Sequence, residues 1–183
     1  EMSPKTRAEA LGRVAWFFSR ATHVDDEIRD RFGRLWDERI AHAQAHPDES
    51  QELEGIFWLA KGQAFSSDWW LPRLRAALKL EPSIATERYM ISKELAESSK
   101  DDPATALAVL KLLLHQRSTG SRVYYDMSRH AVPVVIANAI TSGDAELTAE
   151  ADSFMNELGA RGRHTLEDEV RAVIDGAVTI DDV

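Results

Sequence analysis

The chain has 183 residues, 44% of them hydrophobic and 29% charged, which is typical of a globular protein with a substantial core. It contains no cysteine, which excludes disulfides, thiolate metal sites and a cysteine nucleophile and fits a reducing compartment such as the cytoplasm. The net charge of −9 divides into −2 over residues 1–92 and −7 over residues 93–183, so we expect no nucleic-acid partner.

The amino-terminal residues predict two antiparallel helices. Apolar residues at helical spacing predict a first helix over residues 4–20. Residues 22–25, with the sequence THVD, resemble a capping box in which Thr22 is the N-cap of a second helix. An apolar stripe that begins at Ile28 predicts that this helix continues to just before Pro47.

Residues 54–72 form the densest aromatic stretch of the chain and predict a helical hairpin. Asp48 or Ser50 is expected to begin the third helix, and Ser67 or Asp68 the fourth.

The tryptophans of this region divide into core and surface candidates. Trp58 and Trp70 are predicted to lie in one buried cluster with Phe57, and Trp36 also fits a core position. Trp69, at a helix start, is predicted to be partly exposed.

A possible interaction surface follows from the neighbours of Trp69. An exposed tryptophan beside arginines resembles a binding hot spot. We therefore predict that Trp69, Arg73 and Arg75 form this surface.

The second half of the chain predicts five further helices. Pro133 lies inside one of them, so a kink or a break is expected there. The helices are expected from residue 84 or 86 to 99, from Pro103, over residues 124–140, from Asp144 and from Thr165.

The whole pattern is that of an all-α protein with eight or nine helices, since no segment alternates apolar and polar residues over a strand length. Paired in order, the helices give antiparallel hairpins near residues 4–45, 49–80, 84–116 and 122–161. Because this spacing is irregular, we predict a HEAT-like α-solenoid that forms one helical-repeat domain over residues 1–183. The apolar runs are about half the roughly 20 residues of a membrane span, so no membrane association is expected.

Motifs that carry chemistry are absent from the sequence. It has neither a phosphate-binding loop nor a Gly-x-Ser-x-Gly nucleophile elbow. Glu38, His42 and His46 have the spacing of one helix face and could share a metal ion, but a surface pair and a histidine at a helix C-terminus explain them equally well. We therefore predict no catalytic residue, no cofactor and no metal.

Paired acidic residues are interpreted as helix caps or solvated termini rather than as catalytic carboxylates. The pairs are at residues 25–27, 101–102 and 181–182.

Several segments, in this order, resemble the C-terminal helical region of large bacterial multidomain NTPases, ATP-binding proteins associated with defence against phage. They are EGIFWLA at 54–60 with Phe65 and Trp69, PATAL at 103–107 with Leu110 and Leu113, AITSGD at 139–144, and NELGARG at 156–162. Tyr124 and Tyr125 depart from the Trp-Arg pair that is common in that family.

The resemblance implies a non-catalytic scaffold or sensor at the C-terminal end of a longer protein, whose ATPase motifs would lie upstream. Its partner would be a protein, either the remainder of the larger NTPase or a protein that is sensed. The alternative is a free-standing enzyme with an unrecognised active site.

Overall fold

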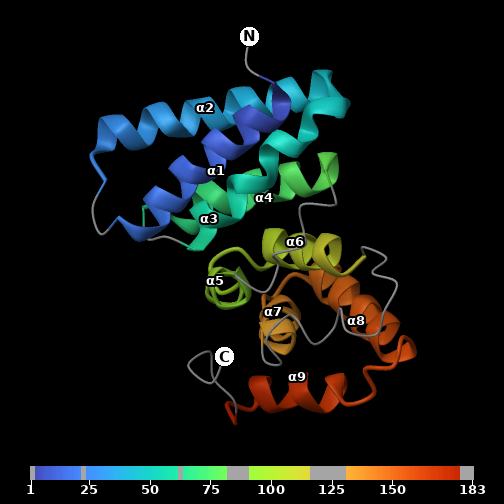
Figure 1. Ribbon diagram of the computed structural model, residues 1–183. Coiled ribbons are helices and arrows are strands. Elements are labelled where there is room, and N and C mark those ends of the chain that lie inside the picture. The colour runs from blue at the N-terminus through green and yellow to red at the C-terminus, as the bar shows by residue number, and fades with distance from the viewer. Residues whose placement is uncertain (1–2, 22–23, 62–63, 82–90, 116–130, 178–183) are drawn as a thin grey trace. The chain divides into compact units, whose positions relative to one another are not determined.

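The computed structural model describes residues 3–21, 24–61, 64–81, 91–115 and 131–177 (Figure 1). These residues form nine α-helices and one 3-10 helix, and none of them lies in a strand. The prediction of an all-α protein is therefore confirmed. Every helix in the described ranges is too short or too polar to cross a membrane.

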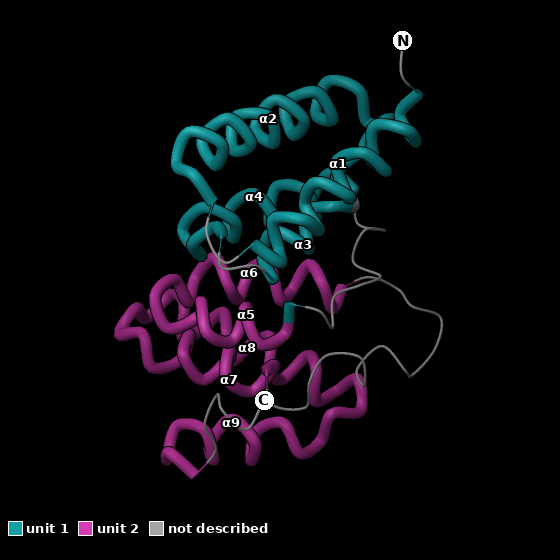
Figure 2. Tube along the Cα trace, turned by 60° about the vertical axis from the view of Figure 1, so that its left-hand side comes forward, with its two compact units in different colours: residues 1–91 teal, residues 92–183 magenta. Residues whose placement is uncertain are grey.

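The chain divides into two compact units, residues 1–91 and residues 92–183 (Figure 2). Stacking of the hairpins into a single solenoid domain stays a prediction. Unit 1 contains α1 (Pro4–Arg20), α2 (Asp26–Ala45), η1 (Pro47–Gly55), α3 (Ile56–Lys61) and α4 (Ser67–Leu80). Unit 2 contains α5 (Ser92–Ser98), α6 (Pro103–His115), α7 (Ala131–Ile140), α8 (Ala145–Ala160) and α9 (Leu166–Ile174).

Some of the predicted helix caps are confirmed, whereas the helices expected from Asp48 or Ser50 and from Ser67 or Asp68 have His46 and Ser66 as their N-cap residues instead. The Asp144 carboxylate accepts hydrogen bonds from the backbone N–H groups of Glu146 and Leu147 at the start of α8, at 2.9 and 3.1 Å. The predicted N-cap of α2 was wrong, because Asp25 takes that position and accepts from Glu27 N at 2.9 Å. Thr22 lies outside the described residues.

The acidic pairs at 25–27 and 101–102 include capping residues, as predicted. The side chain of Asp102 accepts a hydrogen bond from Thr105 N at 2.9 Å in the first turn of α6. Residues 181–182 and residues 84–90 of the predicted fifth helix lie outside the described residues.

The segment after α2 differs from the single third helix that the sequence predicts. It begins as the 3-10 helix η1 and continues as the six-residue α3. Because a 3-10 helix has three residues per turn, the side chains of Glu49 and Glu52 lie on the same side of η1. That side carries ion pairs to Arg7 of α1 and to Arg39 and His42 of α2.

A close glycine contact joins α1 to η1. A Cβ atom added at Gly55 would lie 2.8 Å from the Cα atom of Gly12, whereas a Cβ added at Gly12 would meet nothing within 4 Å. The two backbones approach this closely because residue 55 has no side chain.

We expect Gly55→Ala to destabilise unit 1 by about 1–3 kcal/mol, because α1 and η1 must move apart. Gly12→Ala is the matched control, and we expect it to stabilise α1 by up to about 1 kcal/mol through its helix propensity. Urea unfolding followed by tryptophan fluorescence reports on unit 1, since all five tryptophans lie within residues 1–91. Equal unfolding midpoints for the two variants would contradict the close contact.

In unit 2, α7 is the central helix. It contacts α5, α6, α8 and α9, and residues 131–137 are all buried. A helix that is apolar all round requires such surroundings. Pro133 is the third residue of α7, and the helix continues from it to Ile140. Residues 124–130 of the predicted helix lie outside the described residues, so the expected kink or break at Pro133 stays a prediction.

Candidate functional site

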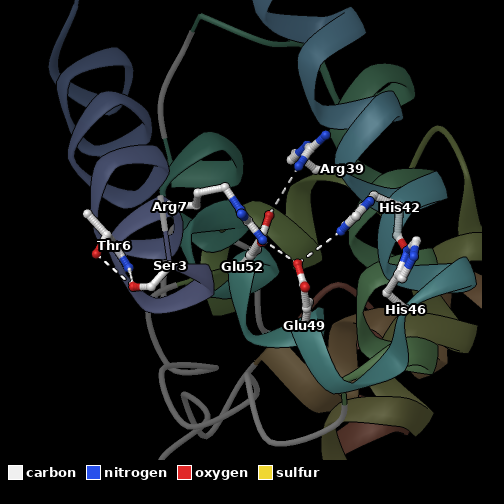
Figure 3. A network of polar contacts seen from close by, with 8 residues as sticks. All are labelled: Ser3, Thr6, Arg7, Arg39, His42, His46, Glu49 and Glu52. Atoms are coloured by element: carbon white, nitrogen blue, oxygen red, sulfur yellow. Dashed lines mark hydrogen bonds and ion pairs between the residues drawn. The ribbon is translucent and has the colours of Figure 1, made fainter. Parts of the chain in front are cut away.

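A partly buried polar network links α1, α2 and η1 (Figure 3). The Arg7 guanidinium donates from Nε to Glu52 Oε1 at 2.5 Å and also pairs with Glu49. Arg39 Nη1 lies 3.4 Å from Glu52 Oε2, and His42 Nε2 lies 3.0 Å from Glu49 Oε2. Only 2% of the Glu52 side chain is exposed, so this carboxylate depends on its two arginine partners.

The same network contains a possible metal-ligand set. One atom each of His42, Glu49 and Glu52 lies within 4.8 Å of the other two. Histidine nitrogen and carboxylate oxygen are suitable ligands for divalent cations. However, the guanidinium groups of Arg7 and Arg39 already neutralise the two carboxylates, and a cation would add charge beside them. The charges therefore favour an ion-pair network that holds three elements together.

The residues singled out at helical spacing, Glu38, His42 and His46, do not converge on one point. The His42 and His46 rings stack with their centroids 4.3 Å apart, and His46 Nδ1 lies 3.1 Å from the carbonyl oxygen of His42. Glu38 instead lines a groove between α1 and α2.

The hydrogen bond from His42 lowers the pKa of Glu49 below 4.5, and the positive charge of Arg7 acts in the same direction. A carboxyl group whose pKa is lower in the folded than in the unfolded state contributes stability above the unfolded pKa. That contribution is lost as the pH falls through the folded pKa.

We therefore expect Glu49→Gln to reduce the loss of stability of unit 1 as the pH falls below about 4.5. Urea midpoints measured by tryptophan fluorescence between about pH 6 and pH 3 give this slope. Asp48→Asn removes an exposed carboxylate of the same segment and serves as the control. If both variants keep the wild-type acid dependence, the lowered pKa of Glu49 is contradicted.

Unit 1 also contains an aromatic cluster, which lies farther along α1 and α2 from the polar network. The rings of Phe18 and Phe32 stack at 4.5 Å between centroids, and those of Phe65 and Trp69 stack at 4.0 Å. Phe65 is 5.7 Å from Phe18 and 6.2 Å from Phe32, so the four rings are continuous. A Cβ atom at Gly33 would lie 3.0 Å from Trp69 Nε1, so this glycine makes room for the indole.

Two of the three residues of the predicted interaction surface, Trp69 and Arg73, are in contact. Arg73 lies 4.4 Å over the Trp69 ring, and Trp69 is partly exposed, as predicted. The Arg73 guanidinium also binds Asp37 in a bidentate manner, at 2.8 and 2.7 Å. Arg75 is half-buried. Since Arg73 already has these intramolecular partners, the role of this surface in binding stays a prediction.

A groove of ≈510 Å³ lies between α1 and α2, and we call it the α1–α2 groove. The stacked rings of Phe18 and Phe32 line it where the aromatic cluster meets the surface. The complete lining is Val14, Phe18, Ile28, Arg31, Phe32, Arg34, Leu35 and Glu38.

Large apolar side chains at this groove are exposed. The exposed fractions are 42% for Val14 and 54% for Ile28, and Phe17, one turn from Val14 on α1, is 68% exposed. The apolar spacing that predicts the first two helices includes Val14 and Ile28, but it did not predict this exposed surface. The available signal was Phe17, which widens the apolar face of α1 beyond what one packed neighbour requires.

Comparison of the chain with protein-family models, curated proteins and solved structures gives no match. The resemblance to NTPase C-terminal regions therefore stays a hypothesis based on the short segments quoted above.

Proposed function

We propose that the chain is a non-catalytic helical module that binds protein through the α1–α2 groove. The observation that carries this proposal is the exposure of Phe17, Val14 and Ile28 beside an open apolar groove. Exposing several large apolar side chains together has a cost in water, and such patches mark sites where a partner covers them. The proposed partner is a protein, either the remainder of a larger NTPase or a protein that the module senses.

The electrostatics support a protein partner over nucleic acid. The chain has a formal net charge of −9, which disfavours a phosphate backbone. A groove that combines apolar side chains with a few charged groups at its edge is typical of protein recognition. The proposed location is the cytoplasm, in agreement with the absence of cysteine.

The alternative of a free-standing enzyme would have its site at the His42, Glu49 and Glu52 cluster. There His42 binds Glu49, and the two carboxylates bind Arg7 and Arg39, so these groups are already used in holding α1, α2 and η1 together. That observation favours a structural role for the cluster and supports the binding module.

We expect groove-dependent binders to emerge when the purified chain is screened against a displayed library of random peptides. Phe17→Glu and Ile28→Glu each place a charge in the apolar surface and should weaken these binders by about tenfold or more. Ile174→Glu is the matched control, because Ile174 is a similarly exposed residue (45%) in unit 2.

Two results would refute this proposal. One is a set of binders that are insensitive to the variants at Phe17 and Ile28. The other is hydrolysis of ATP or tight, salt-dependent DNA binding by the purified chain.

A further inference from the structure

We infer that the α1–α2 groove binds a short amphipathic helix whose apolar face is flanked by Asp or Glu residues. This partner chemistry rests on the proposed function, which assigns protein binding to the same groove. It follows from the form of the groove and from the charges that line it.

The form of the groove favours a helix. Val14 on α1 and Ile28 on α2 project from different helices, and the stacked rings of Phe18 and Phe32 lie between them. Such an open apolar groove accepts side chains that recur at i, i+3 or i+4, and i+7 on one face of a helix. An extended peptide would instead bind through main-chain hydrogen bonds to a sheet edge, and the described part of the chain has no strand.

The charges favour acidic residues on that helix. Arg31 and Arg34 line the groove with a single acid, Glu38. Within the described ranges, neither of these arginines forms an ion pair, whereas Arg29 pairs with Asp26 and Arg39 with Glu52. An otherwise acidic chain thus presents two uncommitted guanidinium groups beside exposed apolar side chains, and an acidic partner complements them.

The same charges disfavour a second copy of this chain as the occupant. In a two-fold dimer the same patch meets itself, so Arg31 and Arg34 of both copies would share one interface in which Glu38 of each copy is the acid of the groove lining. Like charges brought together at an interface are unfavourable. A separate helix with acidic residues avoids this repulsion.

The experiment is a selection from a displayed library of helical peptides about 16 residues long, a length at which a helix can form. Positions on the apolar face are randomised among Leu, Ile, Phe, Met and Trp. The positions that flank this face are randomised between Glu and Lys. Binders are sorted on the wild-type chain and counter-sorted on the Val14→Glu and Ile28→Glu variants. These positions are exposed, and circular dichroism and urea midpoints verify that the variants remain folded.

We expect Glu to exceed Lys by about tenfold or more at the flanking positions of groove-dependent binders. The combined Arg31→Glu and Arg34→Glu variant should instead prefer Lys at these positions. Added salt should weaken the preference of the wild-type chain for Glu. Ile174→Glu should leave binding unchanged.

Groove-dependent binders that are rich in Lys, or have no charge preference, would overturn the acidic partner but retain the proposed protein-binding function. A complete lack of groove-dependent binders would overturn both. Binding of the chain to phosphatidylserine vesicles that is lost in the Val14→Glu variant would also overturn the helical partner, because the occupant would then be a membrane.

Discussion

Trp70→Ala is expected to destabilise unit 1 by about 3–5 kcal/mol, the usual cost of truncating a buried aromatic side chain to alanine. Trp70 is 3% exposed and lies on α4, which packs against α2, α3 and η1. Truncation leaves a cavity where three elements meet, so the loss should affect the whole of unit 1. The measurement is the urea midpoint, followed by the fluorescence of the four remaining tryptophans in residues 1–91.

Trp16→Ala is the matched control, because 44% of the Trp16 side chain is exposed on α1. Its loss removes the contact with Arg20, whose Cζ lies 5.1 Å from the ring centroid, and we expect a smaller cost than for Trp70→Ala because the ring is partly in solvent. If Trp70→Ala leaves the midpoint unchanged, Trp70 is not a core residue and the assignment of the hairpin core is wrong.

The second large effect is expected for Glu52→Ala, at about 3–5 kcal/mol, because it leaves the Arg7 and Arg39 guanidinium groups without their shared carboxylate. The penalty arises mainly at Arg39, which loses its carboxylate, whereas Arg7 keeps its ion pair with Glu49. Adding Arg39→Met to Glu52→Ala removes the charge that has lost its partner and leaves Arg7 paired with Glu49, so the double variant should recover part of the loss. Urea unfolding of the single and double variants forms a double-mutant cycle.

Asp26→Ala is the control for an exposed ion pair. The Asp26 carboxylate lies 2.7 Å from Arg29 and its side chain is 83% exposed, so we expect a loss of less than about 1 kcal/mol. A Glu52→Ala variant as stable as Asp26→Ala would show that the network is not structural, and its metal-binding alternative would regain support.

Local sequence signals predicted most helix positions because they depend on residues close in the chain. The α1 helix has the predicted limits, and Asp144 caps α8 as expected. The prediction for Trp70 was confirmed, but Trp58 is only half-buried. In the short α3, Ile56 and Ala60 share the buried face, and Trp58 points to the opposite side.

The candidate sites depend on residues far apart in the sequence, and no local pattern reports those contacts. The Arg7–Glu52 pair spans 45 positions, and it belongs to the ion pairs that accompany the 3-10 winding of η1. The α1–α2 groove was missed because periodicity indicates which face of a helix is apolar, but not whether a neighbour covers it.

The sequence by itself determined the helical class, the limits of most helices and the caps at Asp102 and Asp144, since spacing and capping act within a few residues. Only the tertiary structure decided which apolar residues stay exposed and which charges find partners. Val14 and Ile28 lie on stripes that resemble core, yet both remain exposed beside the uncommitted Arg31 and Arg34. Burial depends on the separation and direction of packed helices, and these are set by contacts across the fold.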